Sequence, residues 1–456
     1  MKNSPFVSRS RFSPPTLGRL LGAVLSALGT VTLGQGAQAG ARPHEGHAMA
    51  GGADATTPSM AGMPGMVMPS VFAGIPAGRE SSGTAWQPDA TPMFGHHLML
   101  GDDWMLMTHY NVFAAYDEQS GRRGDSQLHS VNWAMLMAER QDAENKLTLR
   151  GMFSLEPWTT TKRGYPLLFQ TGEAYRGRPL IDRQHPHDFF MELSGTYRRA
   201  LAADATAFLY VAPSGEPALG PTAFPHRASA MVNPMAPISH HWLDSSHISF
   251  GVVTLGGSTG RWQIEGSAFN GREPDEDRWD IERPTLDSYA GRLSFNAGAN
   301  WSLQVSRGYM ASPEELHPGE SQHRTTVSAQ HRRGFAGGGQ LATTFAWGVN
   351  RAGGNGTEAY LIESAWETGE KLTIFGRGER VQKTGEELGL NPRAEKFAIR
   401  QLSVGGSYEL TPQGPVAVAL GGAVSYSFKP GQLDAAYGKR PVGAWVFVRI
   451  SPGKKM

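Results

Sequence analysis

Residues 340–350 read QLATTFAWGVN, and their pattern recurs through most of the chain. Leu341, Phe345, Trp347 and Val349 occupy alternate positions, with smaller or polar residues between them. A period of two residues is typical of a β-strand, because successive side chains point to opposite faces of a sheet. This stretch therefore predicts a strand with one apolar face and one polar face.

Sixteen segments with this alternation can be placed along the chain. They lie near residues 104–116, 128–139, 146–156, 188–199, 205–212, 247–255, 261–269, 286–296, 301–310, 323–332, 340–350, 359–367, 371–381, 397–409, 415–428 and 442–450. Short links, such as 141–145 and 368–370, alternate with long ones, such as 157–187 and 213–246. Short turns at one rim and long loops at the other are typical of outer-membrane barrels.

We therefore predict an all-β protein, a single-chain antiparallel transmembrane β-barrel of about sixteen strands, with fourteen as the alternative count. A soluble β fold is the other alternative, because core and solvent also produce strands with two unlike faces. Aromatic residues near strand ends favour the membrane barrel, since such residues gather where lipid meets water. They are Trp104, Trp262, Trp301, Tyr309, Tyr360, Trp366 and Trp445.

The N-terminal part of the chain has a different composition. Residues 1–39 combine a basic start, an apolar stretch over 20–33 and an A-x-A site ending at Ala39, which together predict a secretory signal peptide. Residues 40–92 are rich in Gly, Ala, Pro, Ser and Met without a sustained period, and predict a flexible, disordered tail in the periplasm. Residues 93–456 would then form the barrel in the outer membrane.

Histidine and methionine recur within the predicted tail. The candidate metal ligands there are His44, His47, Met49, Met60, Met63, Met66 and Met68. Thioether sulfur is a soft neutral ligand that suits Cu(I), and imidazole suits Cu(II), zinc and nickel. A Met/His-rich stretch between signal peptide and barrel resembles the layout of the outer-membrane copper-resistance B family. The resemblance implies that the tail captures copper ions; the alternative is a small-residue linker in which these ligands are incidental.

A second group of candidate metal ligands lies in the long links. It consists of His185, His187, Asp188, His240, His241 and His247. The two parts of this group belong to strands that are not neighbours, so they meet only if the 213–246 link folds across the barrel mouth. They would then form a divalent metal site or brace the loops through hydrogen bonds, and the sequence leaves both alternatives open.

Other side chains are expected to face lipid or the lumen. We interpret Met99, Met105, Met107, Met135 and Met137, on the first two strands, as lipid-facing or packing residues, because methionine is a flexible hydrophobe. The polar strand faces would line the lumen. They carry Arg150, Glu156, Glu192, Arg198, Glu265, Arg292, Arg324, Glu363, Arg377, Glu379 and Arg400.

Composition narrows the function further. The 42 Lys and Arg residues nearly balance the 41 Asp and Glu residues, so the charge indicates no nucleic-acid partner, and the chain has no cysteine. No G-x-S-x-G, H-E-x-x-H or phosphate-loop motif occurs, so we predict neither an enzyme nor an organic cofactor. The expected partners are outer-membrane lipid, the barrel-assembly machinery, metal ions or small solutes, and other copies in a homo-oligomer.

The leading hypothesis is an outer-membrane barrel that handles copper or another soft metal by binding, efflux or resistance. The first alternative is a general small-solute porin with an incidental tail. The second is a lipid-modifying enzyme with its site at the barrel rim, where Ser246 and His247 would be the candidate residues.

Overall fold

A computed structural model describes residues 71–101, 103–336 and 338–455 of the chain. Seventeen strands within these ranges form one antiparallel sheet, and sixteen of them make up the barrel wall. They are β2 (Trp104–Gln119), β3 (Ser126–Gln141), β4 (Asn145–Phe153), β9 (Phe190–Ala202), β10 (Ala205–Gly215), β11 (Ser249–Thr259), β12 (Trp262–Phe269), β13 (Ser288–Asn296), β14 (Trp301–Met310), β15 (Gln322–Gly334), β16 (Gln340–Ala352), β17 (Asn355–Glu367), β18 (Leu372–Thr384), β19 (Lys396–Glu409), β20 (Gly414–Phe428) and β21 (Val442–Lys455).

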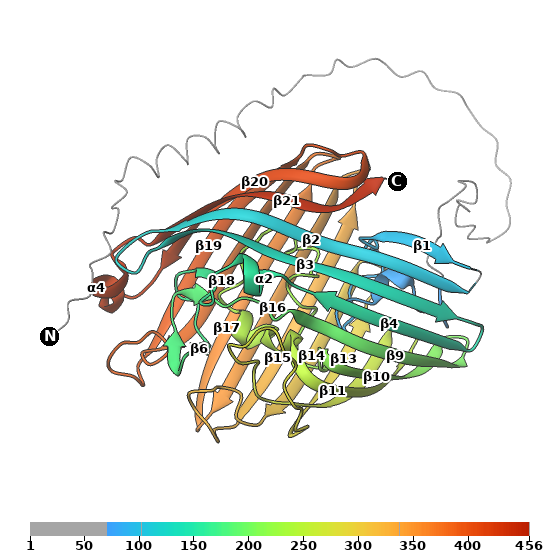
Figure 1. Ribbon diagram of the computed structural model, residues 1–456, viewed down its shortest axis with the longest axis horizontal. Helices are drawn as coiled ribbons and strands as arrows, with labels where there is room; N and C mark the ends of the chain where they lie inside the picture. The colour runs from blue at the N-terminus through green and yellow to red at the C-terminus, as the bar shows by residue number, and fades with distance from the viewer. Residues whose placement is uncertain (1–70, 102, 337, 456) are drawn as a thin grey trace, which may run out of the picture. The chain divides into compact units, whose positions relative to one another are not determined.

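The sheet closes on itself because its first strand pairs with its last (Figure 1). The part of β2 from Val112 to Gln119 pairs with β21, and the part before it pairs with the short strand β1 (His96–Leu100). Closure gives the edges of the wall strands partners, so the described part of the chain leaves no long strand edge to pair with other chains. The predicted closed barrel of sixteen strands is confirmed.

The two rims of the barrel differ in their connections. At one rim, the turn rim, the links are as short as 203–204, 260–261 and 297–300. The links at the other rim, the loop rim, include 154–189 and 216–248. Small elements occupy the loops: α2 (Glu156–Thr159), β5 (Tyr165–Pro166), β6 (Glu173–Tyr175), β7 (Arg178–Leu180), β8 (Arg183–Gln184), α3 (His240–Leu243), η2 (Ser245–His247), η3 (Gly431–Leu433) and α4 (Asp434–Tyr437). The predicted division into short turns and long loops is thus present.

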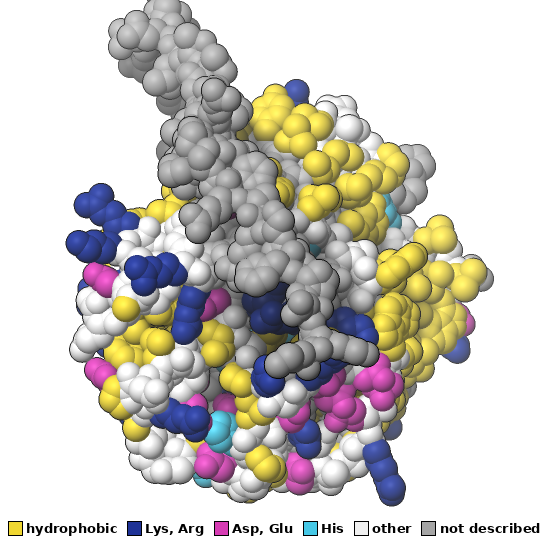
Figure 2. All heavy atoms as spheres, turned by 60° about the vertical axis from the view of Figure 1, so that its left-hand side comes forward, with side chains coloured by type: hydrophobic (Ala, Val, Ile, Leu, Met, Phe, Trp, Pro, Cys, Tyr) yellow, Lys and Arg dark blue, Asp and Glu magenta, His cyan; other side chains and the backbone are white. Residues whose placement is uncertain are grey.

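The outer face of the barrel is apolar, and the inner face is mostly polar. Leu255, Ile264 and Leu402 are exposed outside, whereas Gln263 and Glu265, beside Ile264 in β12, are buried inside. Figure 2 shows charged side chains gathered at the end that carries the long loops and hydrophobic side chains along the wall. This arrangement reverses that of a soluble protein, which buries its apolar residues. None of the helices in the described ranges is long and apolar enough to cross a bilayer.

Exposed aromatic residues lie on the outer wall near both rims. Trp262, Trp301 and Trp366 are near the turn rim, and Tyr289 and Tyr360 are near the loop rim. Two aromatic bands at the ends of an apolar wall are typical of barrels that span a lipid bilayer.

Two residues point to the face opposite to the predicted one. Arg400 is exposed on the same outer face as Leu402, because strand residues two apart share a face and Gln401 occupies the lumen position. Trp445, predicted in an outer aromatic band, is buried and points inward, for the same reason. These positions lie near strand ends, where the alternation in composition is too weak to fix the face.

The link 216–248, which we call the lumen loop, crosses the barrel interior. The backbone N–H of Gly220 donates to Ser306 in β14, and Asn111 in β2 donates to the carbonyl of Met231. Strands β2 and β14 lie opposite each other in the ring, because β14 is the eighth strand after β2. The lumen loop therefore spans the full width of the barrel and reduces the open cross-section.

Residues 71–92, which we call the strap, pack inside the barrel near the turn rim. The strap includes the short helix η1 (Ala77–Arg79). Glu80 pairs with Lys146 in β4 and Arg198 in β9, and the carbonyl of Gln87 accepts a hydrogen bond from Asn296 in β13. The strap differs here from the flexible tail that we predicted. Side chains of the lumen wall form hydrogen bonds with its backbone, and these bonds hold it in place although most of it has no regular secondary structure. Residues 1–70, which hold the predicted signal peptide and the rest of the tail, lie outside the described residues.

Gly348 in β16 allows α3 of the lumen loop to approach the barrel wall. A β-carbon at this position would lie 2.2 Å from the carbonyl oxygen of Trp242. We expect Gly348→Ala to destabilise the docked loop by about 1–3 kcal/mol, because backbone atoms have to shift to remove the clash. Limited proteolysis of the folded protein should then cleave within 216–248 faster than in the native chain. Gly369→Ala is the control, since nothing lies within 4 Å of its β-carbon; equal cleavage of both variants would contradict the prediction.

Candidate functional site

Five histidine rings form a row in the lumen, which we call the histidine row. They are His187, His247, His240, His241 and His185, in spatial order. Successive ring centroids are separated by 5.4, 5.2, 5.3 and 6.0 Å. His185 and His187 come from the 154–189 loop and the others from the lumen loop. The structure thus brings together the two sequence segments, and it does so because the lumen loop folds inward.

Four of these rings are held through their Nδ1 atoms, and that of His185 lies 3.0 Å from the carbonyl oxygen of Pro186. Nδ1 of His187 lies 2.8 Å from a carboxylate oxygen of Glu156, and Nδ1 of His240 lies 2.8 Å from one of Asp244. Nδ1 of His247 lies 2.8 Å from the carbonyl oxygen of Asp244. The Nε2 atoms of His187 and His247 are buried and have no hydrogen-bond partner. Metal-binding histidines are commonly oriented in this way, and histidines that brace a loop also make such contacts.

The carboxylate that orients His240 belongs to a buried ion-pair network. Arg227 lies between Asp244, at 2.7 Å, and Glu363 in β17, at 2.6 Å. Glu363 also contacts Arg377 in β18 at 2.9 Å. Because Arg227 is fully buried, loss of either partner would leave an uncompensated charge in the lumen. The network therefore fixes the lumen loop, and with it His240, against the wall.

Burial keeps part of the histidine row neutral. It lowers the pKa of His240 to about 4, although hydrogen bonding to Asp244 acts in the opposite direction. Burial, followed by repulsion from His240 and His187, also lowers the pKa of His247 well below its usual value. Both rings are thus uncharged near neutral pH, which is the form of imidazole that can bind a metal ion.

The other end of the histidine row meets carboxylates of the loops. His185 Nε2 lies 3.0 Å from Glu173, and His241 Nδ1 lies 3.6 Å from Glu273. Asp188, which the sequence grouped with these histidines, pairs instead with Arg278 at 3.1 Å. Among the described residues, no group of three or more His, Cys, Asp or Glu side chains is arranged to hold a metal ion. Binding at the histidine row would thus require side-chain movement.

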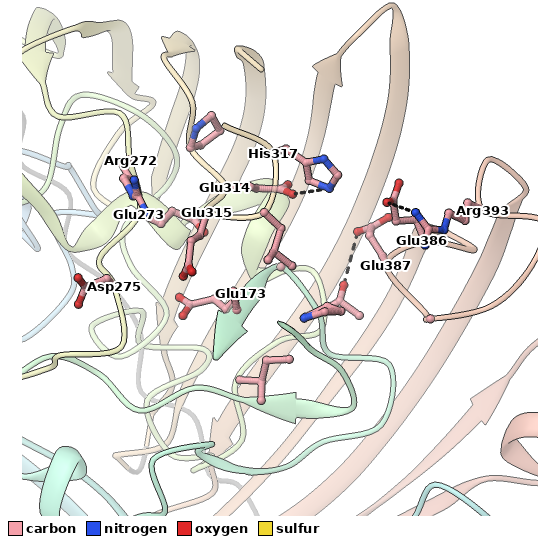
Figure 3. Close-up of a pocket in the computed structure, with 18 of the residues that line it drawn as sticks. Glu173, Arg272, Glu273, Asp275, Glu314, Glu315, His317, Glu386, Glu387 and Arg393 are labelled. Carbon is pink, nitrogen blue, oxygen red and sulfur yellow. Dashed lines mark hydrogen bonds and ion pairs between the residues drawn. The ribbon is translucent and has the colours of Figure 1, made fainter. Parts of the chain in front are cut away.

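Glu173 and Glu273 also line a cavity of about 410 Å³ at the loop rim, which we call the acidic cavity (Figure 3). Seven carboxylates and two arginines line it: Glu173, Glu273, Asp275, Glu314, Glu315, Glu386, Glu387, Arg272 and Arg393. Burial and repulsion from the neighbouring carboxylates, Glu273 first, raise the pKa of Glu314. The excess of carboxylates creates a negative potential that attracts cations. No segment of the sequence alone indicated this cavity, since its walls come from four separate loops.

A second cavity, of about 90 Å³, lies between the strap and the lumen loop, and we call it the methionine pocket. Its lining includes Met93, Met105, Met107, Met135 and Met137, together with His109 and His226. Of the two alternatives predicted for Met105, Met107, Met135 and Met137, lipid contact is therefore wrong, and packing is confirmed because these residues form a buried cluster. Met99, by contrast, is exposed. No local signal could have decided this, because methionine and leucine alternate on the two faces with similar hydrophobicity.

Most other predicted lumen residues are indeed inside the barrel. Glu192, Arg198, Glu265, Arg292, Arg324, Glu363, Arg377 and Glu379 are buried, and Arg150 contacts Glu192 at 3.2 Å. The tail ligands His44, His47, Met49, Met60, Met63, Met66 and Met68 lie outside the described residues. The Ser246 hydroxyl is buried without a hydrogen-bond partner, so it is not paired with His247 as a catalytic dyad.

No protein-family model matches the sequence, and no curated protein sequence matches it either. The chain is structurally similar to an anion-selective porin from Comamonas acidovorans, with 9% identity and a TM-score of 0.48 over 76% of this chain and 100% of that one. It is also similar to Salmonella typhi OmpF in complex with daunomycin, with 10% identity and a TM-score of 0.47 over 78% of this chain and 100% of that one. A third similar structure is the outer membrane channel DcaP of Acinetobacter baumannii, with 10% identity and a TM-score of 0.44 over 79% of this chain and 100% of that one. At these identities and TM-scores the likeness carries no functional argument, so we infer function from the side chains.

Proposed function

We propose that this chain is an outer-membrane, porin-like channel with a narrow bore that favours cations. The membrane location is supported by the apolar outer wall, the two aromatic bands, the closed backbone pairing and the secretory leader that the sequence predicts. Insertion by the barrel-assembly machinery and assembly into a homo-oligomer belong to the same proposal.

The narrow bore follows from what fills the lumen. A ring of sixteen strands is wide enough for a water-filled channel when its interior is open. Here the lumen loop contacts opposite walls, and the strap contacts β4, β9, β12 and β13. A solute would therefore have to pass between these two segments and the wall. This arrangement favours ions and very small solutes over the wider range that an open porin admits.

The preference for cations rests on one observation, the acidic cavity at the loop rim. Six carboxylates other than Glu314, against two arginines, give the entrance a negative potential near neutral pH, and Glu314 adds to it at higher pH. Rings of acidic side chains select cations in channels of many kinds. The cavity adjoins the histidine row through Glu173 and Glu273, so an ion that enters there next meets imidazole nitrogen.

A second function, handling of copper or another transition metal, is favoured by the histidine row. Its buried Nε2 atoms at His187 and His247 have no protein partner, and imidazole is the commonest protein ligand for such metals. The predicted tail would add thioether and imidazole ligands in the periplasm. We propose that transition-metal ions are among the cations that this barrel binds or passes.

Neutralising the acidic cavity tests the channel proposal. We expect the triple variant Glu314→Gln, Glu315→Gln and Glu386→Gln to lose cation preference by about two- to fivefold, because the fixed negative potential falls. Reversal potentials of the purified protein in planar bilayers, under a salt gradient, measure this preference. Glu144→Gln, an exposed carboxylate at the turn rim, is the control. The proposal fails if the native channel prefers anions or if the triple variant behaves like the control.

The protonation of Glu314 should make this selectivity pH-dependent. Its pKa is raised to about 8, so the side chain is largely neutral below that pH and gains a negative charge as the pH rises through it. We therefore expect cation preference to increase between about pH 6 and about pH 9. In Glu314→Gln this increase should be smaller, because the titrating group at the entrance is gone. The same reversal-potential measurement at several pH values makes the comparison, and identical profiles would exclude Glu314 as the source.

Replacing residues 40–70 with a Gly/Ser segment of the same length tests metal handling by the tail. We expect bacteria that depend on this protein to lose copper tolerance, because the substitution removes the thioether and imidazole ligands from the tail. Heat-modifiable migration on gels should be unchanged, since the described barrel does not include these residues. A shuffled tail that retains its Met and His residues is the control. Equal copper tolerance with all three tails would reject a role for the tail in metal handling.

A further inference from the structure

We infer that the methionine pocket binds one soft monovalent metal ion, Cu(I) or Ag(I), through thioether sulfur and imidazole nitrogen. This inference deepens the proposed metal handling and rests on it only for a role in transport. The binding itself can be tested alone. The register of three neighbouring strands brings the ligands together.

The potential ligands lie in two adjacent rows across three strands. His109 in β2 is opposite Met135 in β3, and Met135 is opposite Met152 in β4. In the next row, Met107 is opposite Met137. Directly opposed side chains of an antiparallel pair have β-carbons about 4.5–5.5 Å apart. Four sulfur atoms and one imidazole thus share a small patch of the inner wall.

His226 of the lumen loop covers this patch. Its Nε2 atom lies 3.3 Å from the sulfur of Met152, and its ring centroid is 6.1 Å from that of His109. The indole of Trp133 lies 4.6 Å from His226 and 4.7 Å from His109, between centroids. Burial lowers the pKa of His226 to about 4, so its imidazole is neutral near neutral pH. The loop therefore adds a nitrogen ligand to the sulfur ligands of the wall.

The charged groups around the pocket are already paired with one another. Lys146 contacts Glu80 at 2.8 Å and Glu139 at 2.9 Å, and Arg150 contacts Glu192 at 3.2 Å. These carboxylates are therefore engaged, and a hard cation such as Mg²⁺ or Ca²⁺ would lack free oxygen ligands. Besides a few neutral hydroxyl and amide side chains of the strap and β4, the uncharged groups with ligand atoms in the lining are thioethers and imidazoles. This set of ligands favours soft ions of low charge.

Packing is the competing explanation, because methionine fills irregular gaps in protein cores. The methionines do pack in one buried cluster with Trp133 and Ile248. This packing is incomplete, however, because five methionines line a cavity of about 90 Å³, which exceeds the space that one water molecule requires. Polar side chains would also be the usual choice for a barrel lumen. The methionine lining is therefore better explained by a ligand than by packing.

Titration of the purified full-length protein with Ag(I) in detergent tests the inference. Trp133 packs against His109 and His226, two of the lining residues, so bound silver should quench its fluorescence. Silver binding should also raise the metal content of the protein. We expect Met107→Leu combined with Met135→Leu and Met137→Leu to reduce the bound silver by one ion per chain. We also expect this triple variant to lose the part of the quenching that comes from Trp133. That part is the quenching that disappears in Trp133→Phe. Leucine conserves the volume and polarity of methionine closely, so the barrel should still fold.

Met310→Leu is the matched control, because Met310 is buried elsewhere in the lumen and does not line the pocket. His226→Asn is the second test variant, and it should weaken silver binding at the pocket by at least about tenfold while heat-modifiable folding is retained. Excess Mg²⁺ should not compete. The inference is overturned if the triple variant binds and quenches like Met310→Leu.

This experiment and the channel experiments fail independently. If the methionine triple variant loses silver binding but keeps its cation preference, the bound ion does not lie on the conduction path. If the native protein shows no silver-dependent quenching but keeps cation preference, only the pocket inference falls. If the channel prefers anions but silver binds with the predicted stoichiometry, the channel proposal falls and the pocket remains.

Discussion

The hydrogen bonds between β2 and β21 join the two ends of the sheet, and the other features of the molecule depend on this closure. A barrel in lipid has no water outside to satisfy an open strand edge, so each backbone group of the wall needs a partner within the sheet. Closure also creates an interior that is separate from the exterior. Only then can one face of each strand be apolar and the other carry charges, as in β12.

Within that interior, polar contacts hold the segments in position, as apolar packing does in the core of a soluble protein. Arg227 connects Asp244 of the lumen loop with Glu363 of the wall, and Glu80 connects the strap with β4 and β9. Buried charges of this kind are stable only when they are paired, so they fix the position of the segments that carry them. The same contacts that narrow the bore therefore also orient the histidine row.

The lumen offers cations three chemically different environments. The acidic cavity presents carboxylates, the histidine row presents imidazoles, and the methionine pocket presents thioethers with two imidazoles. Oxygen, nitrogen and sulfur ligands prefer progressively softer ions. A barrel that only admitted small solutes would need charged and hydrated walls, but it would not need sulfur. The methionine pocket is for this reason the feature that most distinguishes this lumen from a simple aqueous pore.

The sequence by itself determined the all-β class and the division between short turns and long loops, because alternation and turn composition are local properties. It favoured a closed barrel of about sixteen strands over fourteen strands or a soluble β fold, and the structure decided among these alternatives. The sequence also identified the histidines of the two loops, though not Arg278 as the partner of Asp188. Only the tertiary structure decided which apolar face of β2 and β3 points inward, since methionine and leucine alternate there with similar hydrophobicity. It alone placed the strap inside the lumen and assembled the acidic cavity, because both depend on contacts between segments far apart in the chain, which no local pattern encodes.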